Sequence, residues 1–294
     1  MQMIDESQEL GQYIPVHYHY NMLLDQARMS GFRAALEYVV RPGAKVLELG
    51  GGTGVLSFFA AKNAAKVYCV EHNPALVREA RRLAAMNPNG HKIEVIHADA
   101  FDYLPPEPVD VVICEMLHVG LLREKQIPVL ESFKQRYLQR FGGPLPVFVP
   151  EACLQAVQPV QQDFSYEGYY APVTLFQDPL AVAERTIPLA SPLLFQQFFY
   201  DEALPKVCEC DAAVTAELSG VCNALRIITK NILAVRLDTR TSIDWYNAHM
   251  IVPLEMPIRI HAGDEIGIEF AYVPGARLEA LQPLVALRAA RKAA

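Results

Sequence analysis

The chain has 294 residues, of which 52% are hydrophobic and 20% charged, so it can form one or two domains with a sizeable core. Its 16 glycines and 21 prolines are too few for a fibrous or low-complexity protein. The formal net charge of −7 argues against a broad nucleic-acid-binding face and suits a basic acceptor.

The start of the chain and its cysteines bear on cellular location. Residues 1–10 are polar and acidic, and no apolar run reaches the ~18 residues that a membrane span needs. The six cysteines include no C-x-x-C pair, which favours reduced thiols and no metal site. We therefore expect a cytoplasmic protein without a membrane partner.

The first half of the chain alternates between strand-like and helix-like segments. Strands are predicted at 45–49, 66–71, 92–97 and 109–114, and helices at 55–65, 75–86 and 123–140. This alternation predicts a parallel sheet with crossover helices. The strand segments are continuous apolar runs, which indicates that both faces of the sheet are buried.

The pattern changes after residue 144. Short strands are predicted at 147–149, 154–160, 214–218, 224–229, 232–237, 251–254 and 266–270. Turn-like sequences separate several of them, which predicts an antiparallel β-domain, either a barrel or a sandwich. The final segment, 278–294, has a helical composition.

A glycine-rich loop at 50–54 lies between the first predicted strand and its helix. Gly50, Gly52 and Gly54 allow positive φ and a close approach of the backbone to a ligand. Glu71 stands at the end of the next strand, 21 residues after Gly50, where a carboxylate can accept both hydroxyls of a ribose. Together these features favour a nucleotide site over an ordinary tight turn with a solvated acid.

The loop lacks the third glycine of a dinucleotide fingerprint, because Val55 or Ser57 occupies that position. This argues against a nicotinamide-dependent oxidoreductase. The stretch 46–54 instead resembles the first motif of class I S-adenosylmethionine-dependent methyltransferases.

That resemblance implies S-adenosyl-L-methionine as the cofactor. The glycine loop, with Glu48 in the same motif, would hold the methionine part, and Glu71 would hold the ribose. Asp99, after the third strand, would lie near the adenine.

Two glutamates nine residues apart flank the loop after the fourth strand. Glu115 follows that strand directly and Glu124 opens the next predicted helix, so both can reach the carboxyl edge of the sheet. Two acids there repel each other unless they share a proton or a cation, and a guanidinium pairs with carboxylates in two places. By spacing alone, a solvated loop acid and a first-turn helix acid remain an alternative.

The segment 115–124 resembles the "double-E" loop of protein arginine methyltransferases, including the Leu-Leu-x-Glu ending at 121–124. Residues 18–28 are similar to the N-terminal helix of that family. The resemblance implies that Arg28 binds the carboxylate of the cofactor and that Asp25 braces the site.

The resemblance extends, more thinly, to the second half of the chain. Residues 145–150 resemble the crossing into the β-barrel of the family, and Asp244-Trp245 resembles its Thr-His-Trp loop. The implied fold class is α/β plus β, a Rossmann-like methyltransferase domain followed by an antiparallel β-barrel-like domain. We expect a cofactor-covering helical segment (1–30), the cofactor-binding domain (31–145), a substrate and dimerisation domain (146–277) and a helical tail (278–294).

The chain also departs from the family pattern. Residues 117–119, Leu-His-Val, replace Met-Gly-Tyr, and Asp244 stands at the position of the barrel histidine, where it could bring another acid near Asp25 and accept a proton.

We expect an N-methyltransferase in which Glu115 and Glu124 orient a guanidinium or amine on a cationic protein, peptide or small molecule. A small-molecule acceptor and a non-catalytic cofactor-binding module are the alternatives. Family members dimerise through an arm, so we also expect a homodimer, with the aromatic stretch 166–176 as its arm.

Overall fold

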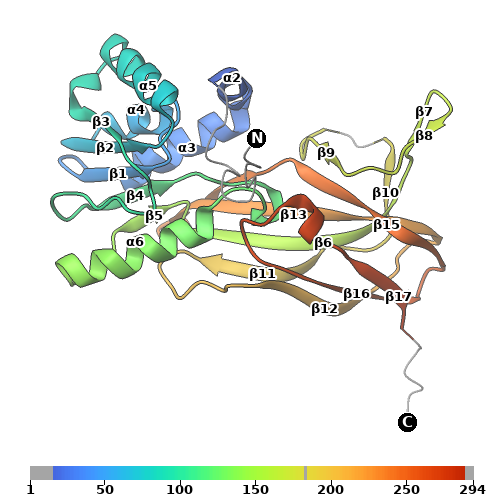
Figure 1. The fold of residues 1–294 in the computed structure, drawn as a ribbon. Coiled ribbons are helices and arrows are strands. Elements are labelled where there is room, and N and C mark those ends of the chain that lie inside the picture. Colours follow the sequence, from blue (N-terminus) through green and yellow to red (C-terminus); the bar gives the residue numbers. More distant parts are fainter. Residues whose placement is uncertain (1–15, 182–183, 289–294) are drawn as a thin grey trace, which may run out of the picture.

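The computed structural model describes residues 16–181 and 184–288. A parallel sheet with its helices occupies one end of the molecule, and antiparallel sheets occupy the other (Figure 1). The predicted fold class, a Rossmann-like core joined to an antiparallel β-region, is confirmed.

Two helices, α2 (Val16–Leu24) and α3 (Gln26–Val39), precede the parallel sheet. They replace the single helix that the family resemblance implied over 18–28. Asp25 ends the first helix in an extended conformation and caps the second, because its carboxylate accepts the Arg28 N–H at 2.8 Å. The cap therefore fixes where α3 begins and places Arg28 in its first turn.

The parallel sheet has the strand order β3-β2-β1-β4-β5. Its strands are β1 (Lys45–Leu49), β2 (Lys66–Glu71), β3 (Ile93–His97), β4 (Val111–Cys114) and β5 (Val147–Val149). The elements between them are α4 (Val55–Ala61), α5 (Pro74–Met86), η1 (Gly90–Lys92), η2 (Val119–Leu121) and α6 (Gln126–Phe141). The strand order reverses between β1 and β4, and ligands of open α/β sheets bind at such a point, beyond the carboxyl ends of the strands.

Two predictions in this half were wrong in detail. Val147–Val149 was expected to start the antiparallel region, but it pairs in parallel with β4 and completes the first sheet, because α6 returns the chain to the same end. The last helix was expected from residue 123, with Glu124 opening it. Leu121 and Arg123 adopt positive φ, so the helix begins only at Gln126 and Glu124 lies in the preceding loop.

The larger antiparallel sheet is built around three long strands, β6 (Ala152–Gln162), β13 (Gly220–Arg236) and β15 (His249–Ile260). The strands paired with them are β9 (Leu175–Gln177), β10 (Thr186–Pro188), β11 (Leu193–Phe199) and β14 (Thr241–Tyr246). A second sheet contains β12 (Cys208–Thr215), β16 (Glu265–Tyr272) and β17 (Leu284–Leu287). Side chains of both sheets and of the parallel sheet belong to one continuous core. We call β6 to β17 the β-region.

A short hairpin of β7 (Ser165–Tyr166) and β8 (Tyr169–Tyr170) projects from the β-region (Figure 1). Its two tyrosines on the second strand, Tyr169 and Tyr170, are 74% and 58% exposed. The hairpin therefore presents aromatic surface that the described part of the chain leaves exposed.

The expected helical tail is wrong for the described residues 278–288. Leu278–Ala280 forms one short 3-10 turn, η3, and Leu284–Leu287 pairs with β16 from Glu269 back to Ile266. The free edge of β16 offers backbone hydrogen bonds that outweigh a modest helical propensity. The rest of that prediction, 289–294, lies outside the described residues.

All six cysteines are buried free thiols. Within the part of the chain that the structure describes, no helix is both long and apolar enough to cross a bilayer.

Candidate active site

The glycine loop leaves β1 with three residues in the left-handed region. Gly50, Gly52 and Gly54 have φ values of 77°, 54° and 81°, which L side chains rarely adopt. A Cβ on Gly52 would lie 2.9 Å from Cε1 of His19, which belongs to α2. The loop thus needs glycine for its conformation and for the close approach of α2 above it.

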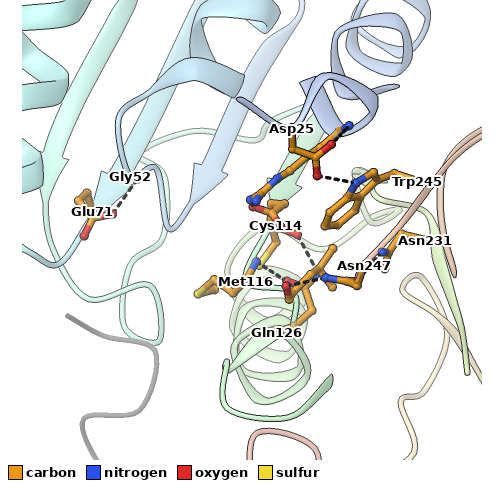
Figure 2. Close-up of polar contacts among 12 residues, drawn as sticks. Asp25, Gly52, Glu71, Cys114, Met116, Gln126, Asn231, Trp245 and Asn247 are labelled. Carbon is orange, nitrogen blue, oxygen red and sulfur yellow. Dashed lines mark hydrogen bonds and ion pairs between the residues drawn. The ribbon is translucent and has the colours of Figure 1, made fainter. Parts of the chain in front are cut away.

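Glu71 is held at the end of β2 by two backbone donors. One carboxylate oxygen accepts the Gly52 N–H at 2.8 Å, and the other accepts the Asn73 N–H at 2.7 Å (Figure 2 shows the first bond). The side chain is 7% exposed. Each oxygen keeps a lone pair for a hydroxyl donor, which fits the predicted ribose contact.

Glu48 and Asp99 are the other two carboxylates that the sequence assigned to the cofactor. Glu48 turns beneath the loop, where it accepts hydrogen bonds from the backbone N–H (3.0 Å) and the hydroxyl of Ser57, and burial raises the pKa of Glu48 to about 7. Asp99 accepts the Phe101 N–H at 2.9 Å. The contacts of Glu48 fix the first turns of α4.

One cavity collects most of the predicted site residues. Its lining includes Arg28, Glu48, Gly50, Gly52, Glu71, Asp99, Glu115 and Glu124. Three other predicted residues, Asp25, Gly54 and Asp244, do not line it. The lining carries five carboxylates and two Lys or Arg side chains, so it suits a cationic guest.

Glu115 directly follows β4 and forms an ion pair with Arg28 of α3. The two side chains are only 9% and 13% exposed, so water screens the pair weakly. The Arg28 guanidinium also lies over the ring of Trp245, 5.2 Å from its centroid. Arg28 is thereby fixed between the parallel sheet and the β-region.

Glu124 reaches the same cavity from the loop before α6. Burial raises the pKa of Glu124 to about 7, and the positive charges of Arg28 and Arg123 oppose this rise. Burial also lowers the pKa of Arg28, while the charges of Glu124 and Asp25 counteract that shift. Glu115 and Glu124 therefore both line the cavity that the glycine loop also lines.

The loop between the two glutamates is held by side chains that the sequence analysis missed. The Gln126 side chain accepts the Met116 N–H at 3.0 Å and donates to the Cys114 carbonyl at 2.7 Å (Figure 2). From the β-region, Thr229 accepts the Gly120 N–H at 2.8 Å. No local signal marks these partners, because up to 109 residues separate them from the loop.

Asp25 and Asp244 have separate partners, although the replacement of the barrel histidine by Asp244 suggested a further acid near Asp25. Asp244 bonds to Lys230, at 2.6 Å, on the neighbouring strand β13. Asp25 instead accepts the indole N–H of Trp245 at 3.2 Å (Figure 2). The strand places adjacent residues on opposite faces, so only Trp245 can point toward α3.

Among residues 117–119, which depart from the family pattern, only His118 is not fully buried. Leu117 and Val119 are buried, whereas His118 meets the ring of Phe176 edge-on, with 5.5 Å between centroids. Burial lowers the pKa of His118 to about 4, so the imidazole is neutral at pH 7. The loop therefore contacts the segment after the exposed hairpin.

Comparison with known proteins shows which families share this sequence and fold. Residues 46–138 match the family described as "Methyltransferase domain". An uncharacterized protein of Methanothermobacter thermautotrophicus is 28% identical over 90% of this chain and 96% of its own length. The arginine N(omega)-methyltransferase of Streptomyces achromogenes subsp. streptozoticus is 25% identical over 87% of this chain and 76% of its own length.

Among solved structures, the PRMT1 enzyme–prozyme heterotetrameric complex of Trypanosoma brucei with AdoHcy has the same fold. It superposes with a TM-score of 0.70 at 17% identity, over 92% of this chain and 96% of that one. Several other curated relatives, plant protein arginine N-methyltransferases among them, are matched over only 39% to 57% of their own length. The predicted resemblance and S-adenosylmethionine as the cofactor are confirmed.

Proposed function

We propose that this chain, a class I S-adenosylmethionine-dependent methyltransferase that resembles the protein arginine methyltransferases, methylates a guanidinium nitrogen. The observation that carries the proposal is the convergence of Glu115 and Glu124 on the cavity that the glycine loop lines. A carboxylate pair beside the cofactor suits an acceptor that is cationic and planar.

The residues that would hold the cofactor fit its chemistry. The loop at Gly50 and Gly52 offers a backbone surface that a side chain would obstruct, and Glu71 offers carboxylate oxygens for a ribose. Asp99 lines the same cavity and would lie near the adenine. Arg28 supplies a cation for the carboxylate of the cofactor. When bound, S-adenosylmethionine supplies an electrophilic methyl group on a sulfonium sulfur, which keeps the bond electrons as the methyl group leaves.

The two glutamates would do most of the work on the acceptor. Glu115 and Glu124 bind the guanidinium from two sides, orient one nitrogen toward the methyl group and draw positive charge onto the other nitrogens. The attacking nitrogen then bears an excess proton. Glu124 is the group we assign to accept it, because its pKa of about 7 suits a general base at neutral pH.

We assign structural roles, and no proton transfer, to Asp25 and Asp244. Asp25 caps α3 and so braces Arg28. Asp244 is bonded to Lys230, and we assign it no proton transfer. We further propose that 31–145 binds the cofactor beneath the segment 1–30, and that 146–277 serves the acceptor and a second copy of the chain.

A free guanidino compound is the second candidate acceptor. The similarity to the Streptomyces arginine N(omega)-methyltransferase favours it, because that match spans 87% of this chain. Both candidates share the guanidinium and differ in what it is attached to. The cytoplasm remains our expected location, since free thiols persist in reducing compartments.

Methyl-labelled cofactor tests the proposal with a mixture of acceptors. The mixture contains arginine peptides, matched lysine peptides, free arginine and other small amines, and mass spectrometry locates the label. We expect label on guanidinium nitrogens, in peptides or in free arginine. Label on lysine or a carboxylate, or no label on any acceptor, would contradict the proposed function.

A further inference from the structure

Trp245 and Asn247 stand two residues apart where β14 leads into β15. Trp245 donates its indole N–H to Asp25 at 3.2 Å, and Asn247 donates its amide to the Leu117 carbonyl at 3.0 Å. The two side chains are 6% and 7% exposed. One short segment of the β-region thus makes a partly buried hydrogen bond to the N-cap of α3 and a buried one to the loop between the two glutamates (Figure 2).

Asp25, the hydrogen-bond partner of Trp245, lies at the start of the helix that carries Arg28. Asp25 caps the helix that carries Arg28, and its second carboxylate oxygen is the one that the indole bonds. The Trp245 ring also lies under the Arg28 guanidinium, 5.2 Å away. The indole therefore holds both the start of the helix and the cation at its first turn.

Leu117, the hydrogen-bond partner of Asn247, lies in the same loop as Glu115. Leu117 lies two residues after Glu115, and its carbonyl is the acceptor of the Asn247 amide. The Asn247 oxygen in turn accepts the side-chain N–H of Asn231 at 2.9 Å, and Asn231 is fully buried in β13. This second bond fixes the rotamer of Asn247, so the carbonyl meets a donor in a set position.

We propose that Trp245 and Asn247 are paired positioning residues that set how Arg28 and Glu115 face each other. The inference rests on the proposed function and extends it. Through Arg28, Trp245 would govern the affinity for the cofactor, and through the loop, Asn247 would govern how the acceptor is oriented. Neither residue lines the cavity, so each acts through another group.

Two substitutions separate these effects. Trp245→Phe keeps an aromatic ring and removes the N–H, and we expect it to raise the Kd for S-adenosylhomocysteine by about 5–10-fold. Asn247→Ala releases the loop, and we expect kcat to fall by about 10-fold while the Kd for S-adenosylhomocysteine changes by less than about twofold. Calorimetry gives the Kd values and initial rates give kcat.

Asn223→Ala is the matched control. Asn223 is a partly buried asparagine of the same strand as Asn231, and it exchanges hydrogen bonds of 2.7 and 2.9 Å with the backbone of Gln162. Its removal should lower Tm without moving Kd or kcat. If Trp245→Phe and Asn247→Ala behave like this control, the positioning roles are wrong.

Different results would contradict the proposed function and the positioning roles of Trp245 and Asn247. A wild-type enzyme that methylates no guanidinium contradicts the proposed function, yet it leaves the affinity for S-adenosylhomocysteine measurable. An unchanged Kd in Trp245→Phe would then overturn the role of Trp245 by itself. A wild-type enzyme that methylates guanidinium compounds, with unchanged kcat in Asn247→Ala, would overturn only the role of Asn247.

Discussion

The charge balance around Arg28 explains why this cavity suits a cationic acceptor. Arg28 pairs with Glu115, and its charge also acts on Glu124. Two carboxylates that converge in a poorly screened position favour a protonated form or a further cation. An acceptor guanidinium supplies that cation, so binding and charge neutralisation coincide.

Glu115→Gln should separate acceptor chemistry from cofactor binding. Glutamine keeps the shape but not the charge, so we expect kcat to fall by about 100-fold or more. The Kd for S-adenosylhomocysteine should stay within about threefold, because Arg28 remains available to the carboxylate of the ligand.

The control is Glu107→Gln, which removes an acid paired with Lys45 outside the cavity. Initial rates give kcat and calorimetry gives the Kd for S-adenosylhomocysteine of both variants. Turnover in Glu115→Gln equal to that of Glu107→Gln would argue against the carboxylate pair.

The pH dependence should follow Glu124. Its pKa is raised to about 7, so the carboxyl is protonated below that pH and ionised above it. Only the ionised form binds a guanidinium as a charge partner. We therefore expect kcat/KM for the acceptor, at saturating cofactor, to rise with pH through about 7 and then level off.

Glu48 has a similar pKa and supplies the comparison. Glu48→Gln should keep the rising limb, and Glu124→Gln should show a low, flat profile. A flat wild-type profile between about pH 6 and pH 8 would be incompatible with this role.

At the level of elements, the glycine loop and α2 both line the cavity, where we propose that the cofactor binds. Alanine at Gly52 meets both a positive φ of 54° and the ring of His19 at 2.9 Å. We expect Gly52→Ala to weaken S-adenosylhomocysteine binding by at least about 10-fold. Calorimetry measures the change.

Gly43→Ala supplies the same backbone strain in open space, because Gly43 has a φ of 84° and no atom within 4 Å of its added Cβ. It should lower Tm and leave the affinity unchanged. Equal affinity losses in both variants would mean that strain, and not the fit of the loop, is responsible.

The elements also show what the sequence could and could not predict. The apolar strands β1, β2 and β4 and the loop at Gly50 were predictable, because their signals lie within a few residues. The edge strand at Leu284–Leu287 was not, since only the neighbouring β16 makes it a strand. Likewise the place of Glu115 directly after β4 was predictable, whereas the bonds from Trp245 and Asn247 join residues 220 and 130 positions apart.

At the scale of the whole molecule, the β-region supports the cavity through hydrogen bonds to the loop between Glu115 and Glu124 and to the N-cap of α3. Its hairpin carries exposed aromatic residues, and Phe176 after it meets His118 of that loop. The segment that follows the hairpin therefore contacts the loop between Glu115 and Glu124.

We expect the hairpin to hold the proposed homodimer together. Replacing Tyr169 and Tyr170 by serine removes most of its apolar surface, so sedimentation should show a shift from dimer to monomer. Leu237→Ser is the control, because Leu237 is 82% exposed in a turn at the other end of β13. A double variant that keeps the wild-type mass would place the dimer contact elsewhere.

The central claim is that two carboxylates recognise a positively charged, planar acceptor. Calorimetry with S-adenosylhomocysteine present can compare an arginine peptide with the same peptide carrying citrulline, its neutral isostere. We expect the arginine peptide to bind at least about 10-fold more tightly, and Glu115→Gln to remove most of that preference. Equal affinity of the wild-type enzyme for the two peptides would contradict the claim.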